Sequence, residues 1–192
     1  MTQDQYPRIQ RKTILSDDWG NLTKYEFDLQ RRTGEWQRLT REVYDRGHGA
    51  TCLLHDPDHD CVLLTRQFRL PIFLSGGPAQ AIEAPAGLLE GEEPAKRMQA
   101  ELIEETGYHI SQLTHLYDLY MSPGSVTEYL SYFIGTYARE NRQSEGGGVV
   151  EEGEDIETIH IPLQKAMEMI KAGEIRDGKT VILLQHLALS LR

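Results

Sequence analysis

Cysteine is nearly absent from this sequence of 192 residues, in which Cys52 and Cys61 are the only two. No second Cys or His pair stands beside them at metal-binding spacing, so neither a zinc site nor a disulfide scaffold is expected. Both fall in expected strands. They could face each other across those strands, but buried free thiols suit such positions better.

Long apolar runs are missing as well. No run approaches the roughly 20 residues that a membrane-spanning helix needs. Residues 1–6 lack the basic segment and the following apolar segment of a secretory signal. We therefore expect a cytoplasmic protein that does not bind a membrane.

Basic residues are in short supply, because 20 Lys and Arg stand against 30 Asp and Glu and give a net charge of −10. This balance opposes tight binding to a nucleic acid backbone, so no nucleic acid partner is expected. It does not oppose a small anionic substrate, because a metal ion and a few local Arg or Lys side chains can neutralise a pyrophosphate. The acidic residues are concentrated in segments 90–93, 101–105 and 151–157.

The second of these segments places Glu101, Glu104 and Glu105 at helical spacing. Positions three and four apart share one face of a helix, where three like charges repel one another. A solvated surface helix is the ordinary explanation of such a pattern. A hard cation offers another, because Mg²⁺ prefers oxygen ligands and usually shares them with substrate phosphates. The pattern therefore indicates a metal site for phosphate chemistry.

The surroundings predict a helix over about residues 94–106. Pro94 follows an acidic turn, and both features favour a helix N-terminus. Met98 and Leu102 fall on a face beside the glutamates and give the helix a side to bury. Gly107 is typical of a C-terminal cap. The segment is expected to be loop, helix and loop, with its acids held in a line.

Together these residues resemble the Nudix box, which reads Gly, five residues, Glu, seven residues, then Arg-Glu-apolar-x-Glu-Glu-x-Gly-apolar. The matching positions are Glu92, Glu101, Leu102, Glu104, Glu105, Gly107 and Tyr108. Two positions depart from the pattern, since Gly87 stands one residue too close to the first Glu and Ala100 takes the place of the Arg. In the family that Arg helps to orient the glutamates, and Arg97, one helical turn earlier, could compensate.

The resemblance extends over essentially the whole chain. Residues 83–87 look like the strand and turn that enter the box in nucleoside diphosphate sugar hydrolases. The runs that resemble the GDP-mannose pyrophosphatase subfamily, close to the ADP-ribose and ADP-sugar pyrophosphatases, are residues 41–47, 66–69, 120–128 and 173–180. The resemblance implies an α/β fold, a Nudix α/β/α sandwich with a mixed sheet, preceded by a small N-terminal antiparallel β meander.

Hydrophobic periodicity divides the chain into a meander over residues 1–45 and a larger domain over residues 46–192, the Nudix domain of the resemblance. Residues 13–45 are expected to form strands, because residues 25–29 alternate apolar and polar side chains and the turn after them leads back into extended structure. In the larger part we expect strands at 50–54, 61–65, 80–83, 113–120, 128–137 and 157–161, and helices at 94–106, 163–171 and 179–191. Such mixed elements favour an α/β sandwich.

Residues 138–156 form an expected loop that is longer than ordinary connections. Long loops are usually functional or disordered, and composition alone leaves both open. The resemblance favours a lid that brings a carboxylate to the metals. Its pattern Glu-x-Glu-Asp-Ile implies Glu152 as general base and Glu154 as metal ligand, although the two roles could be exchanged.

Hydrolysis of a pyrophosphate requires charge neutralisation and a deprotonated water, and Mg²⁺ favours both. We expect Mg²⁺ as the cofactor, with Mn²⁺ as a substitute. Glu101 and Glu105, one turn apart, are the primary side-chain ligands, and Glu104 is a third ligand or an outer-shell acceptor. The resemblance adds the backbone carbonyl of Ala86, and it counts Glu105 with the two loop glutamates among the catalytic residues.

Several side chains are expected to contact the substrate. Arg41 and Arg69 can bind pyrophosphate or base oxygens through a planar fork. Trp19 could stack on a nucleobase, or it could pack inside the meander or a dimer core. Glu42 could accept hydrogen bonds from the N1–H and the amine of guanine. The expected substrate-binding set is Trp19, Thr40, Arg41, Glu42, Arg69, Ala86, Gly87, Leu88, Glu105, Glu128 and Lys179.

The resemblance also implies a homodimer in which the N-terminal meander crosses to the second subunit and completes its active site. The implied activity is Mg²⁺-dependent hydrolysis of a nucleoside diphosphate sugar, first of all GDP-mannose to GMP and mannose 1-phosphate. One alternative is an ADP-ribose or ADP-sugar pyrophosphatase with a different base pocket. Another is a non-catalytic Nudix-like regulator that binds a nucleotide sugar, favoured only by Ala100 and the short loop.

Overall fold

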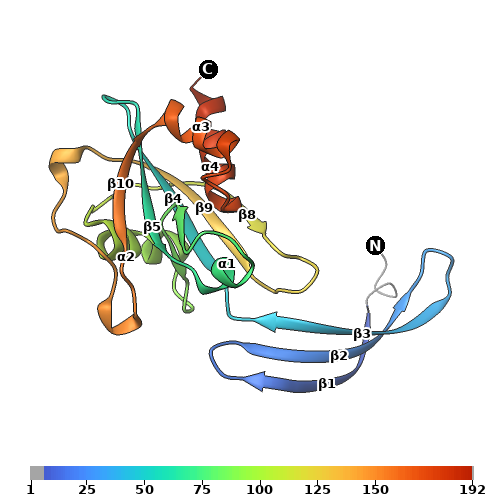
Figure 1. Cartoon of the computed structure of the whole chain (residues 1–192). Helices are drawn as coiled ribbons and strands as arrows, with labels where there is room; N and C mark the ends of the chain where they lie inside the picture. The colour runs from blue at the N-terminus through green and yellow to red at the C-terminus, as the bar shows by residue number, and fades with distance from the viewer. Residues whose placement is uncertain (1–6, 192) are drawn as a thin grey trace. The chain divides into compact units, whose positions relative to one another are not determined.

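The computed structural model describes residues 7–191. The chain forms two compact units, of which the first comprises Met1–His48 and Tyr120–Tyr129 and the second comprises Gly49–Leu119 and Leu130–Arg192. The first unit holds strands β1 to β3, and the second holds the helices and the larger sheet (Figure 1).

The first unit contains a three-stranded antiparallel sheet. Its strands are β1 (Arg8–Asp17), β2 (Asn21–Gln30) and β3 (Trp36–Asp45), in the order β1-β2-β3. The predicted meander is therefore confirmed. β1 begins earlier than the expected residue 13, because most of its side chains are exposed on both faces and leave no alternation to read.

The segment between residues 120 and 129 joins this sheet along β3. The Tyr44 N–H donates to the Ser125 carbonyl at 2.8 Å, and the Thr127 N–H donates to the Tyr44 carbonyl at 3.1 Å. The predicted turn at this place is present, and its backbone hydrogen bonds make it part of the first unit.

The second unit is built on a mixed sheet. Its strands are β4 (Gly49–Asp56), β5 (Cys61–Phe68), β6 (Gln80–Glu83), β7 (Ala86–Leu88), β8 (Thr114–Tyr120), β9 (Tyr129–Thr136) and β10 (Glu157–Pro162). They follow the order β10-β5-β4-β9-β8, with β6 paired to β5 and β7 paired to β4. β4 runs parallel to β9 and antiparallel to β5, which confirms the predicted mixed sheet.

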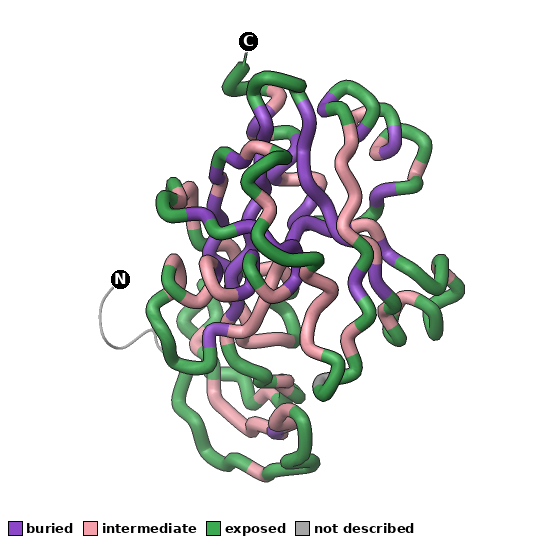
Figure 2. Tube along the Cα trace, turned by 90° about the vertical axis from the view of Figure 1, so that its left-hand side faces the viewer, coloured by how far each residue is buried: buried purple, intermediate pink, exposed green. Residues whose placement is uncertain are grey.

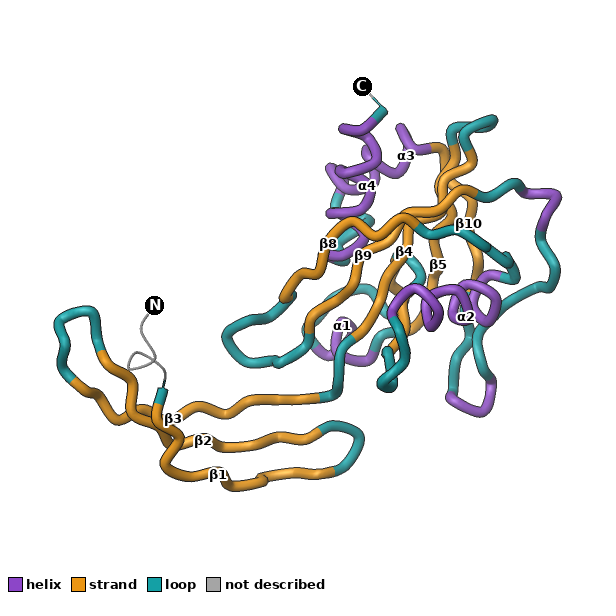
Figure 3. The backbone as a smooth tube through the Cα atoms, turned by 180° about the vertical axis from the view of Figure 1, so that it is seen from behind, coloured by secondary structure: helices purple, strands orange, loops and turns teal. Residues whose placement is uncertain are grey.

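Helices cover both faces of this sheet, with α2 on one face and α3 and α4 on the other (Figures 1 and 3). The helices are α1 (Leu70–Leu74), α2 (Pro94–Thr106), α3 (Leu163–Ala172) and α4 (Gly178–Ser190). β4 is buried along its whole length. Its alternate residues Ala50, Cys52 and Leu54 pack in one core cluster with Met98 and Leu102 of α2. The residues between them point to the opposite face, so the predicted sandwich is confirmed.

Burial differs strongly between the two units. Buried residues gather in the second unit (Figure 2), whereas Thr23 is the only buried residue among those described in the first. Cys52 and Cys61 are both buried and free, as predicted. Within residues 7–191, no helix is long and apolar enough to cross a membrane.

Four short elements were not predicted. α1 has five residues, none of them buried, and β7 has three residues, so neither shows a readable period. The long loop after β9 contains two short 3-10 helices, Arg139–Asn141 and Val150–Glu152. A single helical turn contains too few residues to show a hydrophobic period, so the sequence does not predict it.

Candidate active site

Local signals in the sequence place both ends of α2. The Glu93 carboxylate caps the first turn by accepting from the Ala95 N–H at 3.2 Å and the Lys96 N–H at 3.0 Å. Pro94 lies in the first turn, where its missing N–H leaves no bond unmade. Gly107 ends the helix at φ 78°, a left-handed conformation that glycine adopts without strain. The predicted helix bounds are therefore confirmed.

α2 buries two of its glutamates together with its apolar side. Met98 and Leu102 are fully buried, and Glu101 and Glu105 are buried beside them at 7% and 1% exposure. Glu104 is half-buried. Charged side chains are seldom buried, so two buried glutamates one turn apart indicate a functional rather than a structural role.

Glu105 is the most constrained of these acids. Its Oε2 atom is buried and has no hydrogen-bond partner among the described residues. Burial raises the pKa of Glu105 well above its usual range, the carboxylates of Glu101 and Glu154 raise it further, and Arg69 and Lys179 oppose the rise. A cation at this position would offset the desolvation and the repulsion together. The donor atoms here therefore suit a divalent metal ion.

β7 passes directly over the Glu101 carboxylate. A Cβ atom built on Gly87 would lie 2.6 Å from the Cγ of Glu101 and closer still to its carboxyl group. The turn before β7 is fixed by the Pro85 carbonyl, which accepts from the Cys52 N–H and from the Thr51 Oγ1, both at 3.0 Å. Position 87 therefore requires glycine, because any larger residue would collide with the Glu101 side chain.

The late loop docks on the C-terminal end of α2. The Gly147 N–H donates to the Glu105 carbonyl at 2.9 Å, and the Gly148 N–H donates to the Glu104 carbonyl at 3.0 Å. Residues 146–148 all have positive φ, which their glycines permit. Glu154 lies in this loop, and its Oε2 accepts from a backbone N–H of the same loop at 2.9 Å. The loop therefore brings a third carboxylate near Glu105.

The metal ligand set itself stays a prediction. Among the described side chains, which exclude that of Glu152, no three acidic, His or Cys residues lie close enough together to hold a metal ion. The Arg97 guanidinium lies 2.6 Å from Glu101 and 3.5 Å from Glu104, and it occupies the space between them. The side chain of Glu152, the expected base, lies outside the described residues, so its role is untested.

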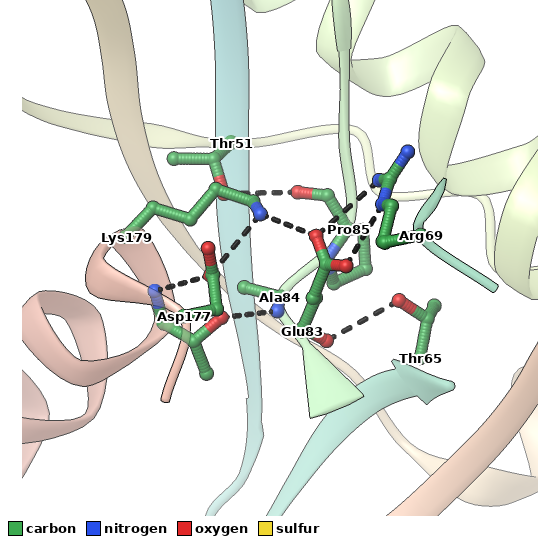
Figure 4. A network of polar contacts seen from close by, with 9 residues as sticks. Thr51, Thr65, Arg69, Glu83, Ala84, Pro85, Asp177 and Lys179 are labelled. Carbon is green, nitrogen blue, oxygen red and sulfur yellow. Dashed lines mark hydrogen bonds and ion pairs between the residues drawn. The ribbon is translucent and has the colours of Figure 1, made fainter. Parts of the chain in front are cut away.

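Two cations of the expected substrate set share one buried carboxylate, that of Glu83 (Figure 4). Its Oε1 lies 2.8 Å from the Arg69 Nε, and its Oε2 lies 2.6 Å from the Lys179 Nζ. Burial disfavours the charge of Glu83, but Lys179 and Arg69 lower its pKa overall. Lys179 also pairs with Asp177 at 3.1 Å. Lys179 is therefore a buried, paired lysine and not a solvated one.

The start of α4 completes this network. Asp177 caps the helix by accepting from the Thr180 N–H at 3.0 Å. The Thr180 Oγ1 accepts from the Ala84 N–H at 2.6 Å, which ties the helix to the residue after Glu83. Sequence reasoning missed Glu83 and Asp177 as functional residues. Only Glu83 could have been identified from the sequence, because it is an acidic residue between apolar neighbours at the end of a short strand.

The first unit holds the remaining expected contacts. Thr40, Arg41 and Glu42 are exposed on β3. Trp19 is 77% exposed, so it does not pack inside the meander, and the Arg46 guanidinium lies 4.9 Å from its ring centroid. Arg46 also lies 3.8 Å from Glu128. The part of these residues in substrate binding stays a prediction.

Comparisons with known proteins agree with this geometry. Residues 8–44 match the family model described as the GDP-mannose pyrophosphatase NudK N-terminal domain, and residues 45–181 match the NUDIX domain. GDP-mannose pyrophosphatases of Escherichia coli O157:H7 and Shigella flexneri are each 49% identical to this chain over 178 residues, 92% of either length.

A solved structure supports the fold. The crystal structure of an ADP compounds hydrolase superposes with a TM-score of 0.72, covering 97% of this chain and 95% of that one. Its sequence identity is 20%, so this likeness bears on the fold alone. The domain match over residues 45–181 and the 49% identity to the curated relatives show that this chain belongs to the Nudix hydrolase family of enzymes.

Proposed function

We propose that this chain is a pyrophosphohydrolase that cleaves GDP-mannose into GMP and mannose 1-phosphate. The observation that carries the proposal is the 49% identity to GDP-mannose pyrophosphatases over 92% of the chain. The match of residues 8–44 to the N-terminal domain of the same enzymes supports it, because these residues lie outside the NUDIX domain match, which covers residues 45–181.

Nudix hydrolases generally need divalent cations, and we assign Mg²⁺ to this one, with Mn²⁺ as a substitute. Glu101, Glu105 and Glu154 would hold the ion, with the Ala86 carbonyl as a further ligand and Glu104 at its edge. The buried, unpartnered Oε2 of Glu105 supports this donor set. When bound, the ion neutralises phosphate charge and favours deprotonation of the attacking water.

The diphosphate meets the paired cations of the second unit. Arg69 offers a planar fork, which suits two phosphate oxygens at once, and Lys179 offers a point charge. Glu83 holds both in place, so little conformational entropy is lost when the substrate binds. The backbone of residues 86–88 passes beside Glu101 of α2. We assign it to the diphosphate-binding site together with Arg69 and Lys179.

The reaction is attack of a water oxygen on a phosphorus of the diphosphate. The bond from that phosphorus to the bridging oxygen breaks, and a loop carboxylate takes the proton of the water. We assign the proton transfer to Glu152 and the ligand role to Glu154. In Glu154→Gln, metal affinity measured without substrate should fall, whereas in Glu152→Gln it should hold while turnover falls. The opposite pattern would exchange the two roles.

The nucleobase and the sugar are assigned to residues of the first unit. Trp19 is exposed and can stack on a base. Glu42, beside Arg41 and Thr40 on β3, is exposed and suited to accept from guanine. Glu128 is assigned to the sugar hydroxyls. Adenine lacks the donors that Glu42 would meet, so Glu42→Gln should narrow the preference for guanine over adenine.

We further propose a homodimer in which the N-terminal meander serves the partner's site. The first unit exposes large apolar side chains, namely Ile9, Ile14 and Leu15 of β1 and Trp19 of the turn that follows. A three-stranded sheet with so little buried surface needs a partner to be stable. Dilution that separates the subunits should abolish turnover, and full activity from a proven monomer would refute the proposal.

The substrate is tested by turnover on GDP-mannose, GDP-glucose, ADP-ribose, ADP-glucose and UDP-glucose, with Mg²⁺ and with a chelator. Preference for GDP-mannose that is lost with chelator supports the proposal. Preference for ADP-ribose would keep the metal site and remove the base assignment of Glu42. Turnover of Glu105→Gln distinguishes an enzyme from a binding module, because an enzyme should lose several orders of magnitude in rate.

A further inference from the structure

Arg97 joins the entering turn to the glutamates of α2. Its Nη2 lies 2.6 Å from the Oε1 of Glu101, and its Nη1 lies 3.5 Å from the Oε2 of Glu104. Its Nε donates to the Leu88 carbonyl at 3.2 Å. The side chain is 18% exposed, so these contacts are made largely away from solvent.

We propose that Arg97 is a positioning residue that holds Glu101 and Glu104 in the arrangement that binds the metal ion. It thereby takes over the work of the arginine that the Nudix box places at position 100, where this chain has alanine. The inference rests on the proposed function, because it concerns the metal site of that reaction.

Helix geometry explains why position 97 can serve. Residues 97, 101 and 104 are separated by four and three positions, so their side chains lie along one stripe of the helix. A guanidinium at the start of that stripe reaches both carboxylates with separate nitrogens. Its five donors in a planar fork leave Nε for a third acceptor, which a lysine could not supply.

Arg97 bears on both departures from the Nudix box, which are the short turn before Glu92 and the alanine at position 100. The turn between Gly87 and Glu92 is one residue shorter than the pattern, and its Leu88 carbonyl is the third acceptor of Arg97. Position 100 is alanine, so the cation that contacts Glu101 and Glu104 comes from position 97. One arginine thus anchors the shortened turn and separates the like charges that follow it.

Repulsion among the acids makes such an anchor necessary. Glu101 and Glu154 both act on the buried Glu105 as like charges. Without a cation between them, Glu101 and Glu104 would be driven apart and towards solvent. If the ion pairs of Arg97 were only structural, their removal would leave metal affinity unchanged. Metal affinity therefore distinguishes a positioning role of Arg97 from a structural one.

The test compares four variants of the full chain with the parental protein. They are Arg97→Ala, Arg97→Lys, the double variant Arg97→Ala with Ala100→Arg, and Lys96→Ala. Lys96 is the matched control, because it is the neighbouring cation on the same helix, pairs with Glu92 at 3.2 Å, and is 76% exposed. Mn²⁺ affinity is measured by titration without nucleotide, and kcat and KM are measured on GDP-mannose.

Arg97→Ala should weaken Mn²⁺ binding by about 10-fold or more and lower kcat with little change in KM. Arg97→Lys should recover only part of the loss, since it restores charge without the fork. Arginine at position 100 in the double variant should restore Mn²⁺ affinity to within about threefold of the parental value, and Lys96→Ala should change neither quantity.

Mn²⁺ affinity of Arg97→Ala within twofold of the parental value would overturn the inference, and so would an equal loss in Lys96→Ala. Failure of the proposed function has a different signature. The parental protein would then bind Mn²⁺ in a manner that depends on Arg97 but would hydrolyse no GDP-mannose.

Discussion

The substitution Gly87→Ala tests how closely catalysis depends on the Glu101 carboxylate. The new Cβ would lie 2.6 Å from the Cγ of Glu101 and nearer to its carboxyl group, whereas real Cβ contacts essentially never fall below 3.0 Å. Gly87 does not have a positive φ, so alanine is compatible with the backbone there. The whole effect should therefore come from displacement of one side chain.

The size of the effect follows from that displacement. The Glu101 carboxylate must move by roughly 1 Å, and a misplacement of this order can lower a rate by about 100-fold. Metal affinity should fall by about 10-fold or more, because an oriented ligand is lost. The free energy of unfolding should fall by only about 1–3 kcal/mol, since the glutamate can rotate away. The variant should fold and yet be nearly inactive.

The assay is kcat with saturating Mg²⁺, together with Mn²⁺ titration and urea unfolding. Gly124→Ala is the matched control, because a Cβ built on Gly124 meets nothing within 4 Å. The reasoning is refuted if Gly87→Ala keeps kcat and Mn²⁺ affinity within threefold of the parental protein while Gly124→Ala behaves in the same way.

Three buried or half-buried ionisable groups of the second unit, Glu83, His160 and Cys52, give three more tests. Glu83→Gln removes the shared carboxylate from the buried Lys179 and the half-buried Arg69, so the free energy of unfolding in urea should fall by about 3 kcal/mol. The control Glu157→Gln, at an exposed position, should lose less than about 1 kcal/mol, and equal losses would contradict this. Burial lowers the pKa of His160 below its usual value, so the stability it contributes is complete above about pH 6.5 and is lost as the pH falls below that. His160→Gln should flatten this part of the pH dependence, and an unchanged slope would count against it. Burial raises the pKa of the Cys52 thiol, so thiol reagents should label it only as fast as the chain unfolds, and rapid labelling of the native protein would be the contrary result.

Elements with local signals could be predicted from the sequence. α2 begins and ends as expected because Pro94 and Gly107 each act through their own backbone. β2 could be predicted because its side chains alternate, and β1 was placed too short because its side chains are exposed on both faces. An alternating pattern therefore predicted β2, and the lack of one hid the first residues of β1.

Long-range pairs of the site could not be predicted. Glu83 and Lys179 are 96 residues apart, and nothing in either neighbourhood indicates the other. Arg97 was identified as a candidate from its helical spacing, but its bond to the Leu88 carbonyl depends on how the turn folds back. Convergence of loop and helix at Glu105 likewise depends on tertiary docking that no local pattern encodes.

The docking of the late loop on α2 limits how this protein can change over generations. The last carbonyls of a helix normally bond to water or to a cap, and here the N–H groups of Gly147 and Gly148 fill that place. Any insertion near these glycines would uncap the helix that carries Glu105 while it shifted Glu154. Changes of length in this loop and changes at the end of α2 must therefore occur together. Substitutions elsewhere in residues 138–156 are tolerated only if Gly147 and Gly148 keep their hydrogen bonds to the helix.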